Sequence, residues 1–202
     1  MLRFIGFYDY TVILTYMSLI SSVLGMVLAR REAFGAAVIC LMVAGLCDAF
    51  DGTVARTKKN RTEDEKSFGI QLDSLCDVVS FGVFPAFLCH CMGIRSMAGI
   101  LLLCGYCVCA VIRLAFFNVL EAKRQKTEGG SNKVYRGLPV TSMSILLPAM
   151  FLFRGILPPV FFQVLLHLLP VAVGFLFILD IPVKKPSLKR LTERKERTKA
   201  KQ

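Results

Sequence analysis

The sequence predicts an all-α, polytopic membrane protein with six transmembrane helices and both termini on the cytoplasmic side. Hydrophobic residues make up 55% of the 202 positions, and the mean hydropathy is +0.60. Several apolar runs are also long enough to cross a bilayer as helices. This composition is too apolar for an ordinary soluble domain of the same size. We therefore expect the chain to be folded largely within a membrane.

The first apolar run, 11–29, holds 19 residues without a charge, close to the roughly 20 that span a hydrocarbon core. No small-residue cleavage site precedes Arg30 and Arg31, so we interpret this run as a retained span and not as a removed signal peptide. The expected spans are 11–29, 33–54, 70–92, 96–120, 139–156 and 159–181. No repeat or second domain is evident. We expect one membrane domain over 1–183 and a basic cytoplasmic tail over 184–202.

The net charge of +11 is distributed unevenly over the six expected spans. Lys and Arg gather in the loops around 56–69 and 121–138 and in the tail, which all fall on one side. The positive-inside rule makes that side cytoplasmic. We expect the cell (inner) membrane as the location. The opposite side carries Arg30, Arg31, Arg95 and Arg154 against Glu32. A basic tail of this kind favours contact with anionic membrane lipids over nucleic acid, because no nucleic-acid-binding module accompanies it.

The eight cysteines all lie in apolar segments. Cysteines in such positions are usually small hydrophobic side chains within a core, and the pattern is not that of a secreted disulfide framework. The cluster Cys89-His90-Cys91 could bind a soft metal, but tight zinc spacings normally come from loops. We therefore predict free, packing cysteines.

Four carboxylates mark the ends of the second and third expected spans. Asp48 and Asp51 are three residues apart, and Asp73 and Asp77 four apart, so each pair lies on one face of its helix. The second span runs inward and the third outward, which brings both pairs to one depth near the cytoplasmic face. Such carboxylates would repel one another unless cations shared the site. Clustered carboxylate oxygens suit Mg²⁺ or Mn²⁺, and two such ions would leave positions for phosphate oxygens.

Small residues and an arginine follow the first carboxylate pair. Gly52 and Ala55 would let a ligand approach the backbone, and Arg56 offers a planar fork to a phosphate. Each residue also has a structural interpretation: the aspartates could pair with Arg113, Gly52 could pack helices, and Arg56 could set topology. These separate roles do not explain why all of these residues gather on adjoining helix ends at one depth.

The pattern Asp48-x2-Asp51-Gly52-x2-Ala55-Arg56, followed by Gly69-x3-Asp73-x3-Asp77, resembles the signature of the CDP-alcohol phosphotransferase family. Twelve residues separate Arg56 from Gly69, more than in the usual family pattern, and we expect the extra residues to lengthen the polar loop 57–67. Within the family, the stretches 72–86, 112–118 and 136–139 are similar to bacterial phosphatidylserine synthases. The resemblance covers roughly residues 10–180.

This resemblance implies an enzyme that transfers a phosphatidyl group from CDP-diacylglycerol to the hydroxyl of L-serine, giving phosphatidylserine and CMP. It makes Asp48, Asp51 and Asp73 ligands of two divalent cations, Mg²⁺ or Mn²⁺. Asp77 would be near the same cations and act as the general base.

The resemblance also assigns residues that border the substrates. The residues expected beside the CDP group are Gly52, Ala55, Arg56 and Gly69. Candidates for holding the serine carboxylate or a lipid phosphate are Arg113, Asn118 and Arg136. Arg113 could instead pair with an aspartate or extend toward the interface.

Two alternatives stay open at this point. The same chemistry could use another acceptor, such as glycerol 3-phosphate or inositol. A protein of another class, a cation transporter, could also hold carboxylates within the membrane, although the almost wholly apolar far halves of the spans argue against transport. Small-residue surfaces around 35–37 and at Gly99 and Gly105 permit a homodimer.

Overall fold

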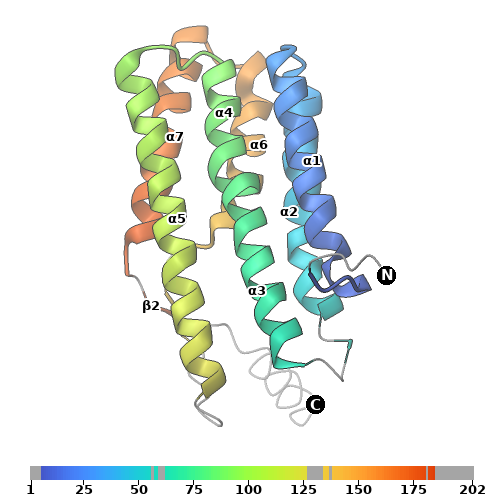
Figure 1. Cartoon of the computed structure of the whole chain (residues 1–202). Helices are drawn as coiled ribbons and strands as arrows, with labels where there is room; N and C mark the ends of the chain where they lie inside the picture. Colours follow the sequence, from blue (N-terminus) through green and yellow to red (C-terminus); the bar gives the residue numbers. More distant parts are fainter. Residues whose placement is uncertain are drawn as a thin grey trace, which may run out of the picture.

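The computed structural model describes residues 6–55, 57–58, 62–126, 134–136, 138–180 and 182–184. Within these ranges the chain forms a bundle of long helices that run up and down beside one another (Figure 1). Five of the helices are long and apolar enough to cross a membrane. The expected class, a helical polytopic membrane protein, is therefore confirmed.

The bundle is built from six apolar segments in chain order. A 3₁₀ turn, η1 (Tyr10–Val12), leads into α1 (Ile13–Arg30), and α2 (Phe34–Ala55) returns antiparallel to it. The third segment joins α3 (Glu63–Asp77), the π-helical turn η2 (Val78–Val83) and α4 (Phe84–Cys91). The remaining elements are α5 (Met97–Lys126), β1 (Val134–Arg136), η3 (Val140–Ser142), α6 (Met143–Leu152), η4 (Phe153–Gly155), α7 (Pro159–Ile178) and β2 (Pro182–Lys184).

The fifth apolar segment is shorter than expected. The expected span 139–156 becomes the helical stretch Val140–Gly155, which is not among the five helices of spanning length. Both of its ends are 3₁₀ turns, and Pro148 lies inside the α-helical part. The stretch is bounded by Pro139 before its first turn and by Gly155 at its last, and proline and glycine are common at helix boundaries. The two strands were also not expected, and they pair antiparallel with Tyr135 opposite Val183.

The third span begins earlier than the sequence analysis placed it. Helix α3 starts at Glu63 and not near residue 70. Thr62 Oγ1 accepts from the Glu65 amide at 3.2 Å, and the Thr62 amide donates to Glu65 Oε2 at 3.0 Å. This capping box stabilises the first helical turn. Part of the stretch expected to lengthen a polar loop therefore extends the helix, and that expectation was wrong in part.

Small residues let α1 and α2 approach their neighbours closely. A Cβ added at Gly25 of α1 would lie 2.2 Å from the Phe84 ring, and one added at Gly45 of α2 would lie 2.1 Å from Ser144 Oγ. Both distances are far below any tolerated contact, so glycine is required at these two positions. The core between the helices includes Leu41, Phe81 and Phe84, each fully buried.

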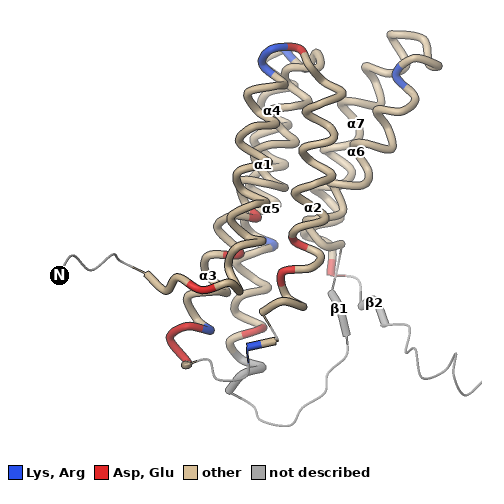
Figure 2. The backbone as a smooth tube through the Cα atoms, turned by 90° about the vertical axis from the view of Figure 1, so that its right-hand side faces the viewer, with Lys and Arg blue, Asp and Glu red and all other residues tan. Residues whose placement is uncertain are grey.

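The two ends of the bundle differ in charge. The acidic positions of α2 and α3 lie in the half where α3 begins, and the far end carries mostly Lys and Arg (Figure 2). The expected basic tail, 184–202, lies outside the described residues except for Lys184, and residues 1–5 lie outside them as well. All eight cysteines are free, as predicted.

Candidate active site

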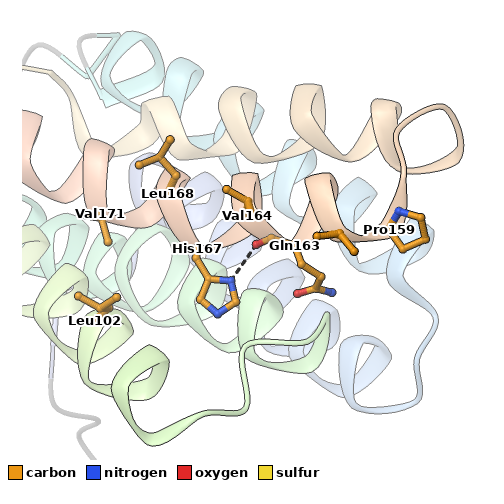
Figure 3. Close-up of a pocket in the computed structure, with 8 residues that line it drawn as sticks. Leu102, Pro159, Gln163, Val164, His167, Leu168 and Val171 are labelled. Carbon is orange, nitrogen blue, oxygen red and sulfur yellow. Dashed lines mark hydrogen bonds between the residues drawn. The ribbon is translucent and has the colours of Figure 1, made fainter.

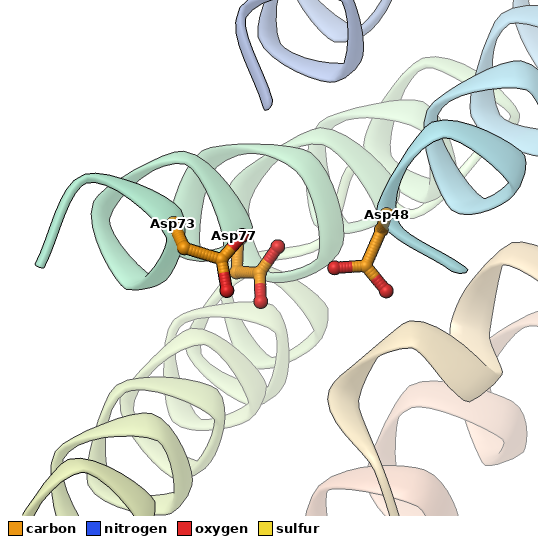
Figure 4. A group of neighbouring side chains, drawn as sticks. All are labelled: Asp48, Asp73 and Asp77. Carbon is orange, nitrogen blue, oxygen red and sulfur yellow. The ribbon is translucent and has the colours of Figure 1, made fainter. Parts of the chain in front are cut away.

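Three carboxylates from two antiparallel helices face one another near the α3 end of the bundle (Figure 4). Asp73 and Asp77 lie one turn apart on α3, and Asp48 of α2 points toward them. One oxygen from each carboxylate lies within 4.8 Å of the others. The helical spacing in the sequence and the antiparallel directions of α2 and α3 together produce this cluster.

Asp51 of α2 joins the cluster through Asp73 of α3. Its side chain interacts with that of Asp73, while the side chain of Asp48 interacts with that of Asp77. Thr15 of α1 donates its hydroxyl to Asp51 Oδ2 at 3.4 Å. The fold therefore brings together all four aspartates that the sequence singled out, in two cross-helix pairs.

The environment of these carboxylates fits a divalent cation. Asp77 is only 8% exposed, and the buried Asp73 Oδ1 has no hydrogen-bond partner among the described residues. No Lys or Arg in the described part of the chain forms an ion pair with any of the four. Buried, mutually close carboxylates without a cationic partner are costly. An all-oxygen donor set of this kind matches the preference of hard cations.

Side chains from two other helices hold α3 in place beside the cluster. Ser74, next to Asp73, donates its hydroxyl to Asn118 Oδ1 of α5 at 2.8 Å. Ser80 lies 3.4 Å from Ser18 of α1, oxygen to oxygen, and both are buried. These contacts fix the rotation of α3 about its axis, and therefore the direction in which its two aspartates point.

A π-helical turn follows Asp77 directly. Pro85 has no N–H with which to satisfy the carbonyl of Phe81 four residues earlier, and the buried Tyr106 hydroxyl of α5 donates to that carbonyl instead. Cys107 of α5 donates weakly to the Gly82 carbonyl at 3.5 Å. Such π turns occur frequently at functional sites and re-aim the residues beside them. Sequence reasoning missed Tyr106, although a tyrosine inside an apolar span is itself a signal for a buried hydroxyl partner.

Asp9, which precedes α1, forms an ion pair with Lys58 in the segment between α2 and α3. Lys58 Nζ lies 2.8 Å from Asp9 Oδ2 and 3.1 Å from Glu65 Oε1. The hydrogen bond from Lys58, together with those from Thr11, lowers the pKa of Asp9 from 3.8 to about 2. The same contacts to Asp9 and then Glu65 raise the pKa of Lys58. This ion-pair network connects the start of α1 to the start of α3.

The other expected site residues differ in how deeply they are buried, and the side chains of two of them cannot be placed. Gly52 is exposed at the end of α2, while Ala55 and Gly69 are half-buried. Arg56 and the side chain of Arg136 lie outside what the structure describes. Arg113 is not a member of the carboxylate group: it is 6% exposed, its guanidinium lies 5.1 Å from the Phe117 ring centre, and it interacts electrostatically with Asp180.

A large groove in the described part of the chain lies away from this chemistry. It is a groove of about 710 Å³ between α5 and α7, lined mainly by apolar side chains such as Leu102 and Val171 (Figure 3). The one histidine of its lining, His167, is hydrogen-bonded through Nδ1 to the Gln163 carbonyl at 2.8 Å. An apolar groove on the outer surface of a membrane bundle is suited to lipid chains. The residues that line it include no cluster of acidic or nucleophilic side chains.

The fold and the cluster together define an integral membrane protein with a carboxylate centre at one end of its helix bundle. The CDP-alcohol phosphatidyltransferase family profile matches residues 10–177, most of the chain. The protein belongs to that family.

Individual relatives carry more specific names. The chain is 38% identical over 109 residues to the CDP-diacylglycerol–serine O-phosphatidyltransferase of Saccharomyces cerevisiae, covering 52% of this chain and 38% of the relative. It is 34% identical over 145 residues to the archaetidylserine synthase of Methanothermobacter thermautotrophicus, covering 69% and 56%. It is 28% identical over 170 residues to the CDP-diacylglycerol–serine O-phosphatidyltransferase of Methanocaldococcus jannaschii, covering 84% and 72%. The chain thus spans about two fifths of the length of the yeast relative and just over half of the length of the archaetidylserine synthase.

Proposed function

We propose that the protein transfers a phosphatidyl group from CDP-diacylglycerol to the hydroxyl of L-serine, giving phosphatidylserine and CMP. The observation that carries the proposal is the four-aspartate cluster formed across α2 and α3 in a member of this family. Similarity to serine-transferring relatives supports serine as the acceptor.

Two divalent cations, Mg²⁺ or Mn²⁺, are the cofactors in this proposal. Asp48, Asp51 and Asp73 would hold them, with Asp77 at the same centre. When bound, such cations stabilise the negative charge that develops on the leaving phosphate. The unpartnered Asp73 Oδ1 supports this assignment, because it is a buried acceptor without a donor in the described chain.

Asp77 is proposed as the general base. Its carboxylate accepts the proton of the serine hydroxyl as the serine oxygen attacks the lipid-side phosphorus of CDP-diacylglycerol. The new bond joins the serine oxygen to that phosphorus, and the phosphorus–oxygen bond to CMP breaks, so CMP departs with the bonding electrons. Low exposure of Asp77 supports this role, since few water molecules can compete for the attacked phosphorus.

The remaining assignments concern substrate contacts. The residues proposed to border the CDP group are Gly52, Ala55, Arg56 and Gly69. Asn118 contacts Ser74, which is next to Asp73, and this bond supports a role near the acceptor. Arg113 and Arg136 are proposed for the serine carboxylate or a lipid phosphate. For Arg113 the contacts to Phe117 and Asp180 are equally those of a buried structural cation.

The proposed setting is the cell (inner) membrane, with the carboxylate end facing the cytoplasm, where serine is available. The positive-inside distribution of Lys and Arg in the sequence supports this orientation. One membrane domain over 1–183, a cytoplasmic basic tail over 184–202 and assembly as a homodimer are parts of the same proposal.

The acceptor is tested by identifying the lipid product. Purified protein is incubated with CDP-diacylglycerol and Mn²⁺ together with serine, glycerol 3-phosphate or inositol, and the lipids are analysed by mass spectrometry. We expect phosphatidylserine and no other phospholipid product. Formation of phosphatidylglycerol phosphate or phosphatidylinositol at a comparable rate would contradict the serine assignment. Flux of Mn²⁺ into vesicles without any lipid product would point to a transporter instead.

A further inference from the structure

A small polar pocket lies at the end of the bundle opposite the carboxylates. It has a volume of about 260 Å³ and combines the last residue of α1, Arg30, with His90 of α4 and Arg95 of the turn before α5. Glu32 and Phe87 complete its polar and apolar sides. Three separate segments of the chain therefore line one recess at this end of the bundle.

The two arginines of this pocket have no carboxylate partner among the residues that the structure describes. Both act electrostatically on the thiol of Cys91, which also lines the pocket, so their charges converge there. Neither Arg30 nor Arg95 forms an ion pair among the residues that the structure describes, Glu32 included. Arg154, at the same end, differs because its guanidinium packs on Phe34 at 4.8 Å.

The backbone on both sides of the pocket is held in place. Helix α1 ends with Ala33 N–H bonded to the Leu28 carbonyl and Glu32 N–H bonded to the Ala29 carbonyl, both at 3.0 Å. Glu32 occupies the left-handed position of this motif with φ of 62°, where glycine is the usual residue. This motif fixes the direction in which the chain leaves α1 beside the pocket.

The turn that carries Arg95 is fixed by a histidine. His90 Nδ1 lies 2.8 Å from the Ile94 carbonyl, and because a carbonyl only accepts, this nitrogen carries the hydrogen. The bond ties the end of α4 to the residue before Arg95. Arg95 is therefore presented from an anchored turn and not from a long free loop.

We propose that this pocket binds the phosphate group of a phospholipid headgroup in the leaflet opposite the carboxylate centre. Two guanidinium groups can donate paired hydrogen bonds to phosphate oxygens, and Arg is the side chain best suited to this geometry. The pocket lies at the ends of spanning helices, where headgroups are located. Phe87 and the exposed Val27, one turn before Arg30, offer apolar contact to the glycerol and upper acyl chain.

The test measures binding of dioleoylphosphatidylglycerol to the purified full chain by native mass spectrometry. Compared with the unmodified protein, Arg30→Gln with Arg95→Gln should weaken binding by about tenfold or more, because two charge-assisted contacts are lost. Arg31→Gln is the matched control, because Arg31 is exposed, adjacent and not part of the pocket lining. It should change binding by less than about twofold.

A second variant and a competitor keep the result interpretable. Arg95→Lys keeps the charge but loses the planar fork, so we expect an intermediate loss. Inorganic phosphate should displace the lipid only weakly. Equal loss in Arg31→Gln and in the double variant would overturn the proposal by showing non-specific surface charge. Binding of inorganic phosphate without retention of the lipid would overturn the lipid assignment. Neither outcome depends on the reaction at the carboxylate end.

Discussion

The two ends of the helix bundle carry opposite charges in different environments. At the α3 end, four aspartates are brought together inside the fold, with Thr15 as the neutral donor to one of them. At the far end, arginines lie around an open recess or pack on aromatic rings. Gathering like charges in a buried position destabilises a protein, whereas cations at a membrane surface are well solvated. The acidic end is therefore destabilising unless cations offset its charge, whereas the basic end is not.

The largest expected effect is the loss of the proposed base. Asp77→Asn should lower turnover by about 100- to 10,000-fold, because the amide cannot accept the serine proton. Binding of CDP-diacylglycerol should remain measurable. The matched control is Asp64→Asn in the exposed first turn of the same helix, which should retain nearly full activity. Normal turnover of the Asp77 variant would remove this residue from the base role.

The second effect concerns stability with and without metal. In EDTA, Asp73→Asn should raise the melting temperature, because the repulsion between Asp73, Asp51 and Asp48 is reduced. In Mn²⁺ the order should reverse, since the variant binds the cation less tightly and gains less stability from it. Differential scanning fluorimetry in both buffers measures this crossover. A variant with unchanged stabilisation by Mn²⁺ would show that Asp73 is not a ligand.

The third effect tests the π turn after Asp77. Tyr106→Phe leaves the buried Phe81 carbonyl without its donor, which should cost about 1–3 kcal/mol of stability. Turnover should also fall, because the turn sets the direction of Asp77. Tyr16→Phe, on the half-buried face of α1, is the control. An unaltered melting temperature for Tyr106→Phe would contradict the role of Tyr106 as the donor that stabilises this turn.

The smallest effect is expected from the ion-pair network at the start of α1. Asp9 has a lowered pKa of about 2, so its contribution is complete above its ordinary value of 3.8 and is lost as the pH falls toward 2. Lys58 has a raised pKa, so its contribution is complete below 10.5 and is lost at higher pH. Between these limits both groups contribute fully, so neither should make stability change with pH. Asp9→Asn should change the melting temperature only slightly, and less in high salt, because ion pairs at solvent-accessible positions contribute little.

The sequence was sufficient to predict the helical membrane class and the meeting of the four aspartates. Both follow from local rules: apolar length gives the spans, and spacing of three or four residues aligns each carboxylate pair. The early start of α3 was also encoded, since Thr62 and Glu65 form a recognisable capping box.

Other features depend on contacts between distant segments. The bond from Ser74 to Asn118 joins residues 44 positions apart, and that from Tyr106 to Phe81 joins residues 25 apart. Neither can be deduced before the helices are packed. The position of Arg113 beside Phe117 and Asp180, away from the carboxylate group, likewise comes from packing.

The most direct test of the carboxylate end is CMP release by the purified full chain. The protein is assayed with CDP-diacylglycerol while serine and Mn²⁺ are each supplied or withheld. We predict CMP release only when both are present, with one phosphatidylserine formed for each CMP. Equal CMP release without serine, or undiminished release in excess EDTA, would contradict a cation-dependent phosphatidyl transfer to serine at the four aspartates.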